Sequence, residues 1–333
     1  MNFDCRQAIK EIVEFNNTPA ECKPQLHVAW GVDKNFMFGA AISMMSVLQN
    51  NRDIFIHFHL FTDYIDNDYK TRVAELARTF ATKITIYVID SDELKILPFS
   101  HAWSHAMYFR FVAFEYLSED VDALLYIDAD VICKGSLHNL MDISFEDKVA
   151  AVVQDVEDSP ARRTGTPDFN ENYFNSGVMY TNLVAWRKFN FLNAAFEMLL
   201  DEKQKHSFPD QDVLNILFKD KVIYLPRIYN AIYGIKQELK SKDINRYQDY
   251  IKPETILIHY IGVTKPWNSW AKYPSAQYFT TAWKASPWAN IPLLGPRTPK
   301  QFKKKSRHEK LQGKILASIA SYIGYLIAKL KQK

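Results

Sequence analysis

The sequence predicts an α/β domain with a mostly parallel central sheet. Short runs rich in β-branched and aromatic residues alternate with segments in which apolar residues recur at helical spacing, which is the pattern of βαβ units. Hydrophobic residues make up 47% of the 333 residues and aromatic residues 14%, enough for a large core. No linker interrupts this pattern before the prolines of residues 287–299. We therefore expect one domain over residues 26–290, an N-terminal extension over 1–25 and a separate C-terminal segment over 291–333.

The individual elements follow from this alternation in chain order. A strand is expected at 26–32, where Leu26 to Val32 is mainly apolar, and a helix at 36–50, where the spacing becomes helical. The same pair recurs at 54–61 with 66–80 and at 84–89 with about 103–117, before a strand at 124–127. Later strands are expected at 150–153, 177–181, 222–225 and 255–260, and later helices near 190–204 and 211–219. Open parallel sheets bind ligands beyond the carboxyl ends of their strands, so the residues that follow these strands are the candidates for a site.

Charge is distributed unevenly along the chain. The formal net charge is +3, but residues 301–333 hold nine basic residues against one acid, a net +8, so the preceding 300 residues carry −5. Such asymmetry indicates an anionic partner at one end, either a membrane surface or nucleic acid. Residues 1–17 mix charged with apolar residues, which excludes the apolar core of a signal peptide. No stretch reaches the roughly 18 to 20 uncharged apolar residues of a spanning helix.

The cysteines and glycines limit the kinds of binding site that the sequence can encode. The cysteines Cys5, Cys22 and Cys133 show no metal-binding spacing, which fits a reducing cytosol. Only 10 of the 333 residues are glycine, and neither GxGxxG nor GxxxxGK[ST] occurs. If the protein binds a nucleotide, something other than a glycine-rich loop must neutralise the phosphates.

The strongest candidate for that task is the pair of acids after the fourth strand, Asp128-Ala129-Asp130. Residues two apart on an extended backbone point to the same side, so the two carboxylates can bracket a divalent cation such as Mg²⁺ or Mn²⁺ that holds a diphosphate. One alternative is a solvated loop with two acids. Another is the aspartyl pair of a dehalogenase-type phosphatase, although that motif belongs on a first strand and three strand patterns precede this one.

Other polar clusters follow or precede predicted strands. His259 ends the strand at 255–260 and is a plausible third metal ligand, or else a core histidine. Lys265 could donate to a departing phosphate, or be a surface charge. The segment 173–177 offers amide and hydroxyl donors suited to sugar hydroxyls, and the acids of 208–212 suit either a site or the capped first turn of a helix.

Taken in order, these motifs resemble one family. Residues 26–290 are similar to the family 8 retaining glycosyltransferases of the GT-A fold, and within that family to the bacterial lipopolysaccharide core glucosyl- and galactosyltransferases. Lys34 stands where many members have an acid, and Ser176 where Ala is common. The motifs are Asp33-Lys34-Asn35, Tyr108 with Arg110, Leu124 to Asp130, Asn175-Ser176-Gly177, Asp210-Gln211-Asp212 and His259 to Trp267, with Trp30 to Asn35, Tyr126 to Gly135 and His259 to Trp270 carrying the narrower likeness.

The resemblance implies a role for each matching position. Asp128, Asp130 and His259 would ligate Mn²⁺ or Mg²⁺ at the diphosphate of a UDP-hexose. Asp33, Asn35 and the backbone near Val32 would hold uridine and ribose, with Ala129 in the same donor site and Arg110 near the sugar or phosphate. The donor sugar would contact Asp155, Asn175, Ser176, Asp210 and Gln211, and the diphosphate Gly262 and Lys265.

The reaction implied is transfer of glucose from UDP-glucose to a sugar hydroxyl of the lipopolysaccharide outer core, with a 1,2-linkage. The alternatives are the same chemistry with UDP-galactose, or a non-catalytic nucleotide-sugar binder at a membrane surface. Gln211 would lie nearest the anomeric carbon, and an amide is a poor nucleophile, which favours a front-side reaction. Asp212 is the candidate nucleophile for a covalent intermediate, and Lys265 would stabilise the leaving phosphate.

The basic C-terminal segment predicts an amphipathic helix. Apolar residues from Leu311 to Leu330 recur at spacings of three and four, while Lys310, Lys314, Ser318, Ser321, Tyr325 and Lys329 share the other face. Residues 301–333 are therefore expected to lie on an anionic inner-membrane surface, which makes the protein cytoplasmic and peripheral on the inner face of that membrane. The alternative is a helix packed on the body. Nucleic acid is not an expected partner, because the aliphatic face would have no role there.

Overall fold

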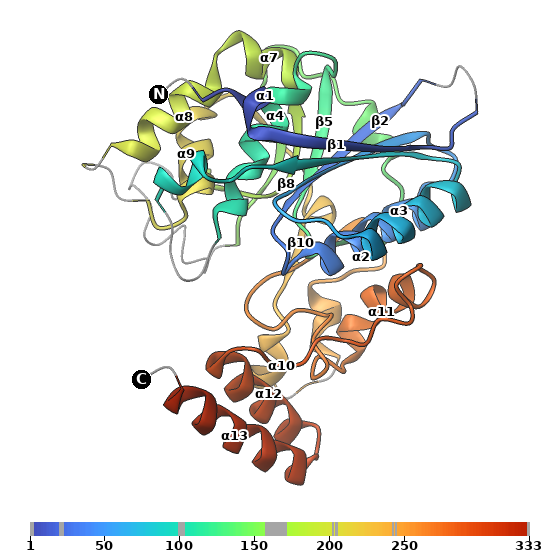
Figure 1. The fold of residues 1–333 in the computed structure, drawn as a ribbon, viewed down its shortest axis with the longest axis vertical. Helices are drawn as coiled ribbons and strands as arrows, with labels where there is room; N and C mark the ends of the chain where they lie inside the picture. Colours follow the sequence, from blue (N-terminus) through green and yellow to red (C-terminus); the bar gives the residue numbers. More distant parts are fainter. Residues whose placement is uncertain are drawn as a thin grey trace.

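A computed structural model describes residues 3–19, 23–98, 104–156, 172–201, 203, 206–241, 243 and 245–331, and the statements below concern these residues. An eight-stranded sheet forms the upper part of the molecule in Figure 1, with strand order β1-β4-β3-β2-β5-β8-β7-β9. Its strands are β1 (Ile9–Asn16), β2 (Leu26–Val32), β3 (Ile56–Thr62), β4 (Lys83–Ile89), β5 (Ala123–Ile127), β7 (Ala150–Gln154), β8 (Phe174–Asn182) and β9 (Val222–Tyr224).

Four adjacent strands form the parallel centre of this sheet. β4, β3, β2 and β5 run in one direction. β1 is antiparallel to β4, and β8 is antiparallel to both of its neighbours, β5 and β7. The chain passes outward from β2 through β3 to β4 and then returns to β5 on the other side of β2. The carboxyl ends of β2 and β5 therefore lie at the point where strand order reverses, where a crevice forms in open α/β sheets.

Helices cover both faces of the sheet. On one face α2 and α3 pack against alternate residues such as Phe58 and Leu60, and on the other α4, α8 and α9 pack against residues such as Phe61. α3 begins where Asp66 caps the amide of Tyr69 at 2.8 Å. The longer helices are α2 (Met37–Asn50), α3 (Asn67–Thr79), α4 (Phe109–Leu117), α8 (Phe191–Leu200), α9 (Pro209–Leu217), α11 (Gln277–Lys284), α12 (Pro299–Leu311) and α13 (Ile315–Leu330).

A second, three-stranded sheet joins this domain to the lower part of the molecule. It contains β6 (Val131–Cys133), β10 (Ala231–Tyr233) and β11 (Leu257–Tyr260) in the order β10-β11-β6. β6 follows the two acids after β5 almost directly, and β11 pairs with it antiparallel. The described residues also include the short α-helices α1 (Cys5–Ala8), α5 (His138–Met141), α7 (Leu183–Lys188) and α10 (Lys236–Ser241). The thiols of Cys5 and Cys133 are free and buried, and Cys22 lies outside the described residues.

Two expectations at the ends of the domain need correction. Residues 9–16, assigned above to an extension, form β1, which pairs antiparallel with β4 at the edge of the main sheet. Its exposed charges, including Lys10 and Glu14, hid the strand pattern, and such charges are typical of edge strands. The stretch 287–299 is not a free linker, because Trp288 is buried against Tyr69 with ring centroids 5.3 Å apart.

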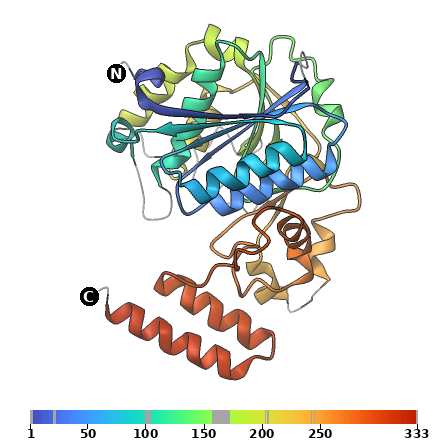
Figure 2. The same ribbon diagram turned by 45° about the vertical axis from the view of Figure 1, so that its right-hand side comes forward.

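The C-terminal segment forms two helices rather than one. α12 and α13 lie side by side as a hairpin that extends from the lower part of the molecule in both views (Figures 1 and 2). The chain turns between them at Gly313, whose φ of +76° favours glycine. Among the described residues, no helix is long and apolar enough to cross a membrane.

Candidate active site

Three candidate metal ligands meet at the crevice beyond β5. Asp128 and Asp130 follow β5, and His259 on β11 reaches them because β11 pairs with β6. Nε2 of His259 lies 3.2 Å from a carboxylate oxygen of Asp130 and 3.9 Å from one of Asp128. One ligand atom from each residue lies within 4.8 Å of the others. Two carboxylates and an imidazole in this arrangement fit a divalent cation such as Mn²⁺ or Mg²⁺.

The other ring nitrogen of His259 has a partner of its own. Nδ1 lies 3.2 Å from Oδ1 of Asn230, a residue that the sequence patterns did not single out. This contact orients the ring so that Nε2 faces the two acids, as outer partners of metal-bound histidines commonly do. Asn230 comes directly before β10, and nothing in its local sequence distinguishes it from a turn residue.

Gly177 allows the three ligands to approach one another. A Cβ at this position would lie 2.3 Å from Cε1 of His259 and 2.8 Å from Oδ2 of Asp128. Both distances are far below normal van der Waals contact, so any side chain there would displace the ring or the carboxylate. The glycine of the Asn175-Ser176-Gly177 motif is therefore required by packing around the ligands.

Arg110 connects the acids at the edge of the site. Its guanidinium donates to Asp128 at 2.9 Å and to the carbonyl of Ser176 at 2.8 Å, and it lies 3.2 Å from Asp210. Burial raises the pKa of Asp210, and Arg110 opposes that shift. With its side chain only 5% exposed and its nitrogens engaged, Arg110 orders the carboxylates rather than facing open solvent.

Lys265 is paired with a candidate metal ligand. Its ammonium forms an ion pair with Asp130 and donates to the carbonyl of Tyr260 at 3.0 Å. Burial alone would raise the pKa of Asp130, but Lys265 and His259 hold it well below its ordinary value. Asp130 is therefore ionised at neutral pH, as a ligand to a cation must be.

Gln211 and Asp212 on α9 belong to one hydrogen-bond network. Oε1 of Gln211 accepts from the amide of Ser176 at 2.9 Å, and Nε2 lies 3.2 Å from the hydroxyl of Tyr173. Asp212 accepts from that same hydroxyl at 2.5 Å and from the amide of Phe208 at 2.9 Å. Both carboxylate oxygens of Asp212 are thus used inside the protein. Asp210 is not the N-cap of α9, because that position is Phe208, which has no side-chain cap hydrogen bond; both acids lie in the first turn of the helix instead.

Two further expected residues join this network. Asn175 donates to Oε1 of Gln211 at 3.2 Å, and Oδ2 of Asp155 lies 3.5 Å from Nε2 of Gln211. Asp155 is buried at the end of β7. The residues expected to contact a donor sugar therefore converge on Gln211 from β7, β8 and α9.

The expected nucleoside residues lie at the carboxyl end of β2. Val32 is buried, Asp33 accepts from the amide of Asn35 at 2.8 Å, and Lys34 lies with its ammonium 3.8 Å above the Tyr64 ring. Arg297, which the sequence analysis did not single out, donates to Asn35 at 3.2 Å. Because Arg297 comes from the segment before α12, only the folded chain could reveal this contact.

The loop after β11 provides an open approach beside Lys265. Gly262 has a φ of +91° and no atom within 4 Å of where a Cβ would stand. α12 supports this loop through buried His308, whose ring nitrogens lie 2.8 Å from the Tyr273 hydroxyl and 3.5 Å from that of Thr264. Burial lowers the pKa of His308 to about 4. α12 is thus part of the body rather than a detachable tail.

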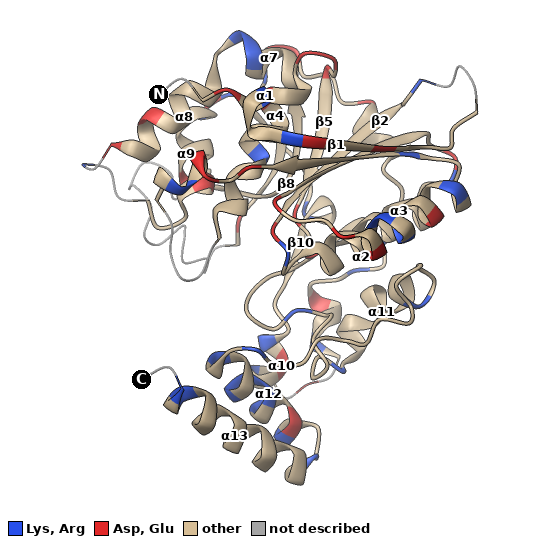
Figure 3. Ribbon diagram, viewed as in Figure 1, with Lys and Arg blue, Asp and Glu red and all other residues tan. Residues whose placement is uncertain are grey.

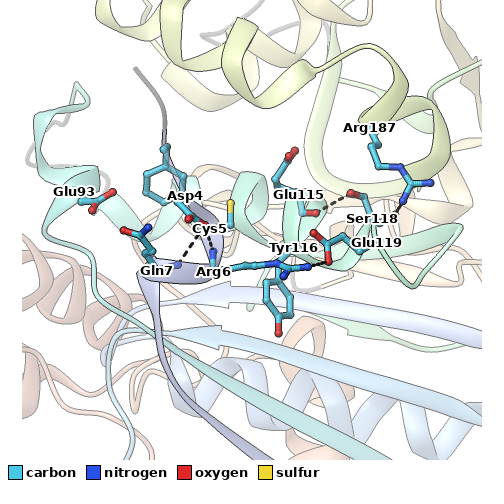
Figure 4. A pocket seen from close by; sticks show the side chains of 11 residues that line it. Asp4, Cys5, Arg6, Gln7, Glu93, Glu115, Tyr116, Ser118, Glu119 and Arg187 are labelled. Carbon is cyan, nitrogen blue, oxygen red and sulfur yellow. Dashed lines mark hydrogen bonds and ion pairs between the residues drawn. The ribbon is translucent and has the colours of Figure 1, made fainter.

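A separate cleft of about 510 Å³ lies beside α1 and α4 (Figure 4). Its acids include Glu115 and Glu119, and Arg6 forms an ion pair with Glu119 across it. Ser118 and Arg187 complete the far side, where the arginine donates to the Ser118 carbonyl at 2.8 Å. None of the expected site residues lines this cleft, and its charged groups do not converge on a common point. The crevice between β2 and β5 is therefore the candidate active site.

Comparison with known proteins identifies the family of this chain. Residues 27–271 match the glycosyl transferase family 8 model, and residues 273–329 match the C-terminal model of the same family. The chain is 41% identical to a lipopolysaccharide 1,2-glucosyltransferase of Escherichia coli over 99% of both chains. It is 38% identical to the lipopolysaccharide 1,3-galactosyltransferase of Salmonella typhimurium, with 97% of each chain covered.

A solved structure shares the same architecture. The galactosyltransferase LgtC, determined in complex with donor and acceptor sugar analogs, superposes with a TM-score of 0.64 at 26% identity. The match covers 84% of this chain and 100% of LgtC, and the fold is therefore the GT-A fold expected from the sequence. The two family models together span nearly the whole chain, and both acids of the strand-end pair lie beside His259. This protein therefore belongs to glycosyltransferase family 8.

Proposed function

We propose that the protein transfers glucose from UDP-glucose to a sugar hydroxyl of the lipopolysaccharide outer core, forming a 1,2-linkage with retention at the anomeric carbon. Two relatives of 41% and 39% identity carry the name lipopolysaccharide 1,2-glucosyltransferase. UDP-galactose is the second candidate donor, because a 1,3-galactosyltransferase is 38% identical over almost the same length. The observation that carries the proposal is the convergence of Asp128, Asp130 and His259 at the reversal of strand order.

These three residues would hold Mn²⁺ or Mg²⁺ at the diphosphate of the donor. When bound, the cation supplies positive charge that stabilises the leaving phosphate as a Lewis acid. The protein prepares this site in advance, because Asn230 orients His259 and Arg110 holds Asp128. Preorganised charge of this kind needs little rearrangement at the moment of reaction.

Lys265 and Gly262 would contact the diphosphate directly. Lys265 has a flexible side chain that now pairs with Asp130, and its ammonium can turn to a phosphate oxygen when a cation neutralises the two acids. Gly262 leaves free space beside the lysine, so a backbone amide can approach the phosphates closely. At the other end of the donor, Asp33, Asn35 and the backbone at Val32 would bind the uridine and ribose.

The donor sugar would lie over Gln211. Asn175, Ser176 and Asp155 contact that amide, and Asp210 lies beside Arg110. These groups would offer donors and acceptors to sugar hydroxyls, while Ala129 between the two acids adds no bulk near the donor. An amide is a weak nucleophile, and its Oε1 already accepts three hydrogen bonds. We therefore favour the front-side reaction, in which the departing phosphate takes the proton of the acceptor hydroxyl.

Asp212 is the alternative nucleophile, but its position argues against that role. Both of its oxygens accept hydrogen bonds from protein groups, and the residue is 8% exposed. A covalent route would require Asp212 to leave the Tyr173 hydroxyl and the Phe208 amide. Mass spectrometry of the enzyme quenched during turnover should find no glycosyl adduct on Asp212, and a trapped adduct would overturn the front-side assignment.

The donor and the reaction are tested by one assay. UDP release is measured from UDP-glucose and from UDP-galactose, each with Mn²⁺ or Mg²⁺. Each reaction is run with and without lipopolysaccharide core acceptor. NMR of the product gives its anomeric configuration. We expect acceptor-dependent release from UDP-glucose that is lost in Asp130→Asn. Preferential release from UDP-galactose would reassign the donor, and no acceptor-dependent release from either sugar would overturn the proposal.

We further propose that the α12–α13 hairpin attaches the enzyme to the anionic cytoplasmic face of the inner membrane. α13 packs on α12 through its polar side, where Ser318 donates to the Ser306 carbonyl at 2.8 Å and Ser321 donates to Glu309 at 2.6 Å. The apolar side of α13 is left exposed, with Leu316 at 84%. Polar groups are therefore inside this hairpin and apolar groups outside, the reverse of a helix docked on a soluble body.

The charge around the hairpin fits an anionic lipid surface. Figure 3 shows Lys and Arg gathered on α10 and α12, and residues 301–333 carry the net +8 derived above. Each basic residue near an anionic membrane contributes roughly 1 kcal/mol of attraction. The exposed apolar residues of α13 would then enter the interface, and they include Ile315, Leu316, Ile319, Tyr322, Ile323, Leu326, Ile327 and Leu330.

The structure of the hairpin also dictates how this attachment is tested. Removing residues 301–333 would take away His308 and uncover the loop that holds Lys265, so the chain should be cut after Gly313, which leaves α12 in place. Full-length protein should sediment with phosphatidylserine-containing vesicles at low salt, whereas the shortened chain and Leu316→Ser/Ile323→Ser should not. Val184→Ser, which changes an exposed apolar residue of α7, is the matched control. Equal sedimentation of all four proteins would contradict the membrane proposal.

A further inference from the structure

Three histidines cluster on the main sheet far from the family's metal ligands. His27 on β2 lies directly opposite His57 on β3, and His59 follows two residues later on the same face. His27 and His57 lie near the amino ends of their strands and His59 lies at the middle of β3, whereas Asp128 and Asp130 follow the carboxyl end of β5. The cluster is therefore distinct from the donor site.

The ring nitrogens of these histidines converge. Nδ1 of His27 lies 3.0 Å from Nε2 of His59, and the rings of His57 and His59 are 3.9 Å apart between centroids. One nitrogen from each of the three rings lies within 4.8 Å of the other two. Ring nitrogens this close together can coordinate one ion, because imidazole nitrogens are common ligands of transition metals.

Neighbouring side chains fix two of the rings. The Thr85 hydroxyl on β4 lies 2.8 Å from Nε2 of His57, and the Tyr87 hydroxyl lies 3.1 Å from Nδ1 of His59. Each contact fixes one ring nitrogen, as outer partners of metal-bound histidines do. The other nitrogen of His59, Nε2, faces Nδ1 of His27, so an ion held between these two rings would replace their mutual contact. Lys83 on β4 acts on the cluster through its positive charge, and its ammonium is paired with Glu14 at 2.8 Å.

We propose that His27, His57 and His59 form a second metal site, which binds one Zn²⁺ or a similar imidazole-preferring ion. Three neutral nitrogens suit Zn²⁺ rather than Mg²⁺ or Mn²⁺, which prefer oxygen ligands. His27 is only partly buried, so an ion can enter there and a water can take the fourth position. The ion would join β2 to β3 at the amino end of the sheet and act on stability rather than on catalysis.

The test uses full-length Asp130→Asn protein, so that the donor site does not contribute, after removal of metals with EDTA. The protein is exposed to Zn²⁺ alone and passed over a desalting column, and bound zinc is measured by mass spectrometry. We expect one zinc per chain and a rise in Tm of a few degrees at saturating Zn²⁺. Less than a tenth of an equivalent of zinc would overturn the proposal.

Variants assign the bound ion to the cluster. In the same background His27→Gln, at the partly exposed position, should lose the zinc while circular dichroism reports an unchanged fold. Thr85→Val keeps all three ligands but removes an outer partner, and should weaken zinc binding about 10-fold or more. His138→Gln removes a surface histidine that pairs with Asp53 and should retain full binding. Zinc retained equally by His27→Gln and His138→Gln would show that the ion binds elsewhere.

Discussion

Replacing Gly177 by alanine tests whether the acids and His259 act as one preorganised site. The added methyl group would lie 2.3 Å from Cε1 of His259, where about 3.4 Å is the ordinary limit, so the ring must move by about 1 Å. Misplacement of a reacting or binding group by that amount typically costs on the order of 100-fold in rate, or about 3 kcal/mol of transition-state stabilisation. We therefore expect kcat/KM to fall about 100-fold in Gly177→Ala, with weaker Mn²⁺ binding.

The assay is UDP release at saturating acceptor with Mn²⁺ titrated over the full range. Gly295→Ala is the matched control, because a Cβ there would have no atom within 4 Å. Thermal unfolding without metal shows whether the variant remains folded, and overpacking should destabilise it by about 1 to 3 kcal/mol. Turnover and Mn²⁺ affinity in Gly177→Ala within threefold of those in Gly295→Ala would refute the reasoning.

Three further substitutions probe the groups around the site. His308→Gln removes a histidine whose pKa is about 4 in the folded protein and 6.5 in the unfolded chain. As the pH falls below 6.5 the unfolded chain takes up a proton that the folded protein does not, so the wild type loses stability. Between pH 6.5 and 4 this loss should be about 3 kcal/mol greater in the wild type than in the variant, as measured by urea unfolding. Arg110→Lys should lose about 2 kcal/mol of stability in the same assay, because one ammonium cannot serve Asp128, Asp210 and the Ser176 carbonyl together. Tyr173→Phe removes the hydroxyl shared by Asp212 and Gln211, and kcat should fall about 10-fold with little change in donor KM; an unchanged kcat would show that this network does not position Gln211.

Much of the main sheet could be predicted from the chain alone. The strands at 26–32 and 124–127 are short, nearly continuous apolar runs, because central parallel strands are buried on both faces. Asp128 and Asp130 could be identified because both lie at the end of one such run. Local order along the chain is enough for inferences of this kind, since every residue concerned belongs to one element.

The strand at 9–16 was not predicted, because its own sequence does not have the pattern of an inner strand. Its position at the sheet edge exposes Lys10 and Glu14 and leaves none of its residues fully buried, so it lacks the continuous apolar run that identifies an inner strand. Only its pairing with β4 defines it, and pairing between distant segments leaves no local signature.

The sequence by itself determined the α/β class, the strand-end acids and the amphipathic character of residues 311–330, because each depends on the order of residues within single segments. The tertiary structure decided which groups meet. It brought Asn230 to His259, placed His27 beside His57 and His59, and enclosed both oxygens of Asp212. It also turned the polar side of α13 toward α12 and left its apolar side exposed. Amphipathicity shows that a helix has two faces, but only packing against a neighbour decides which face is buried.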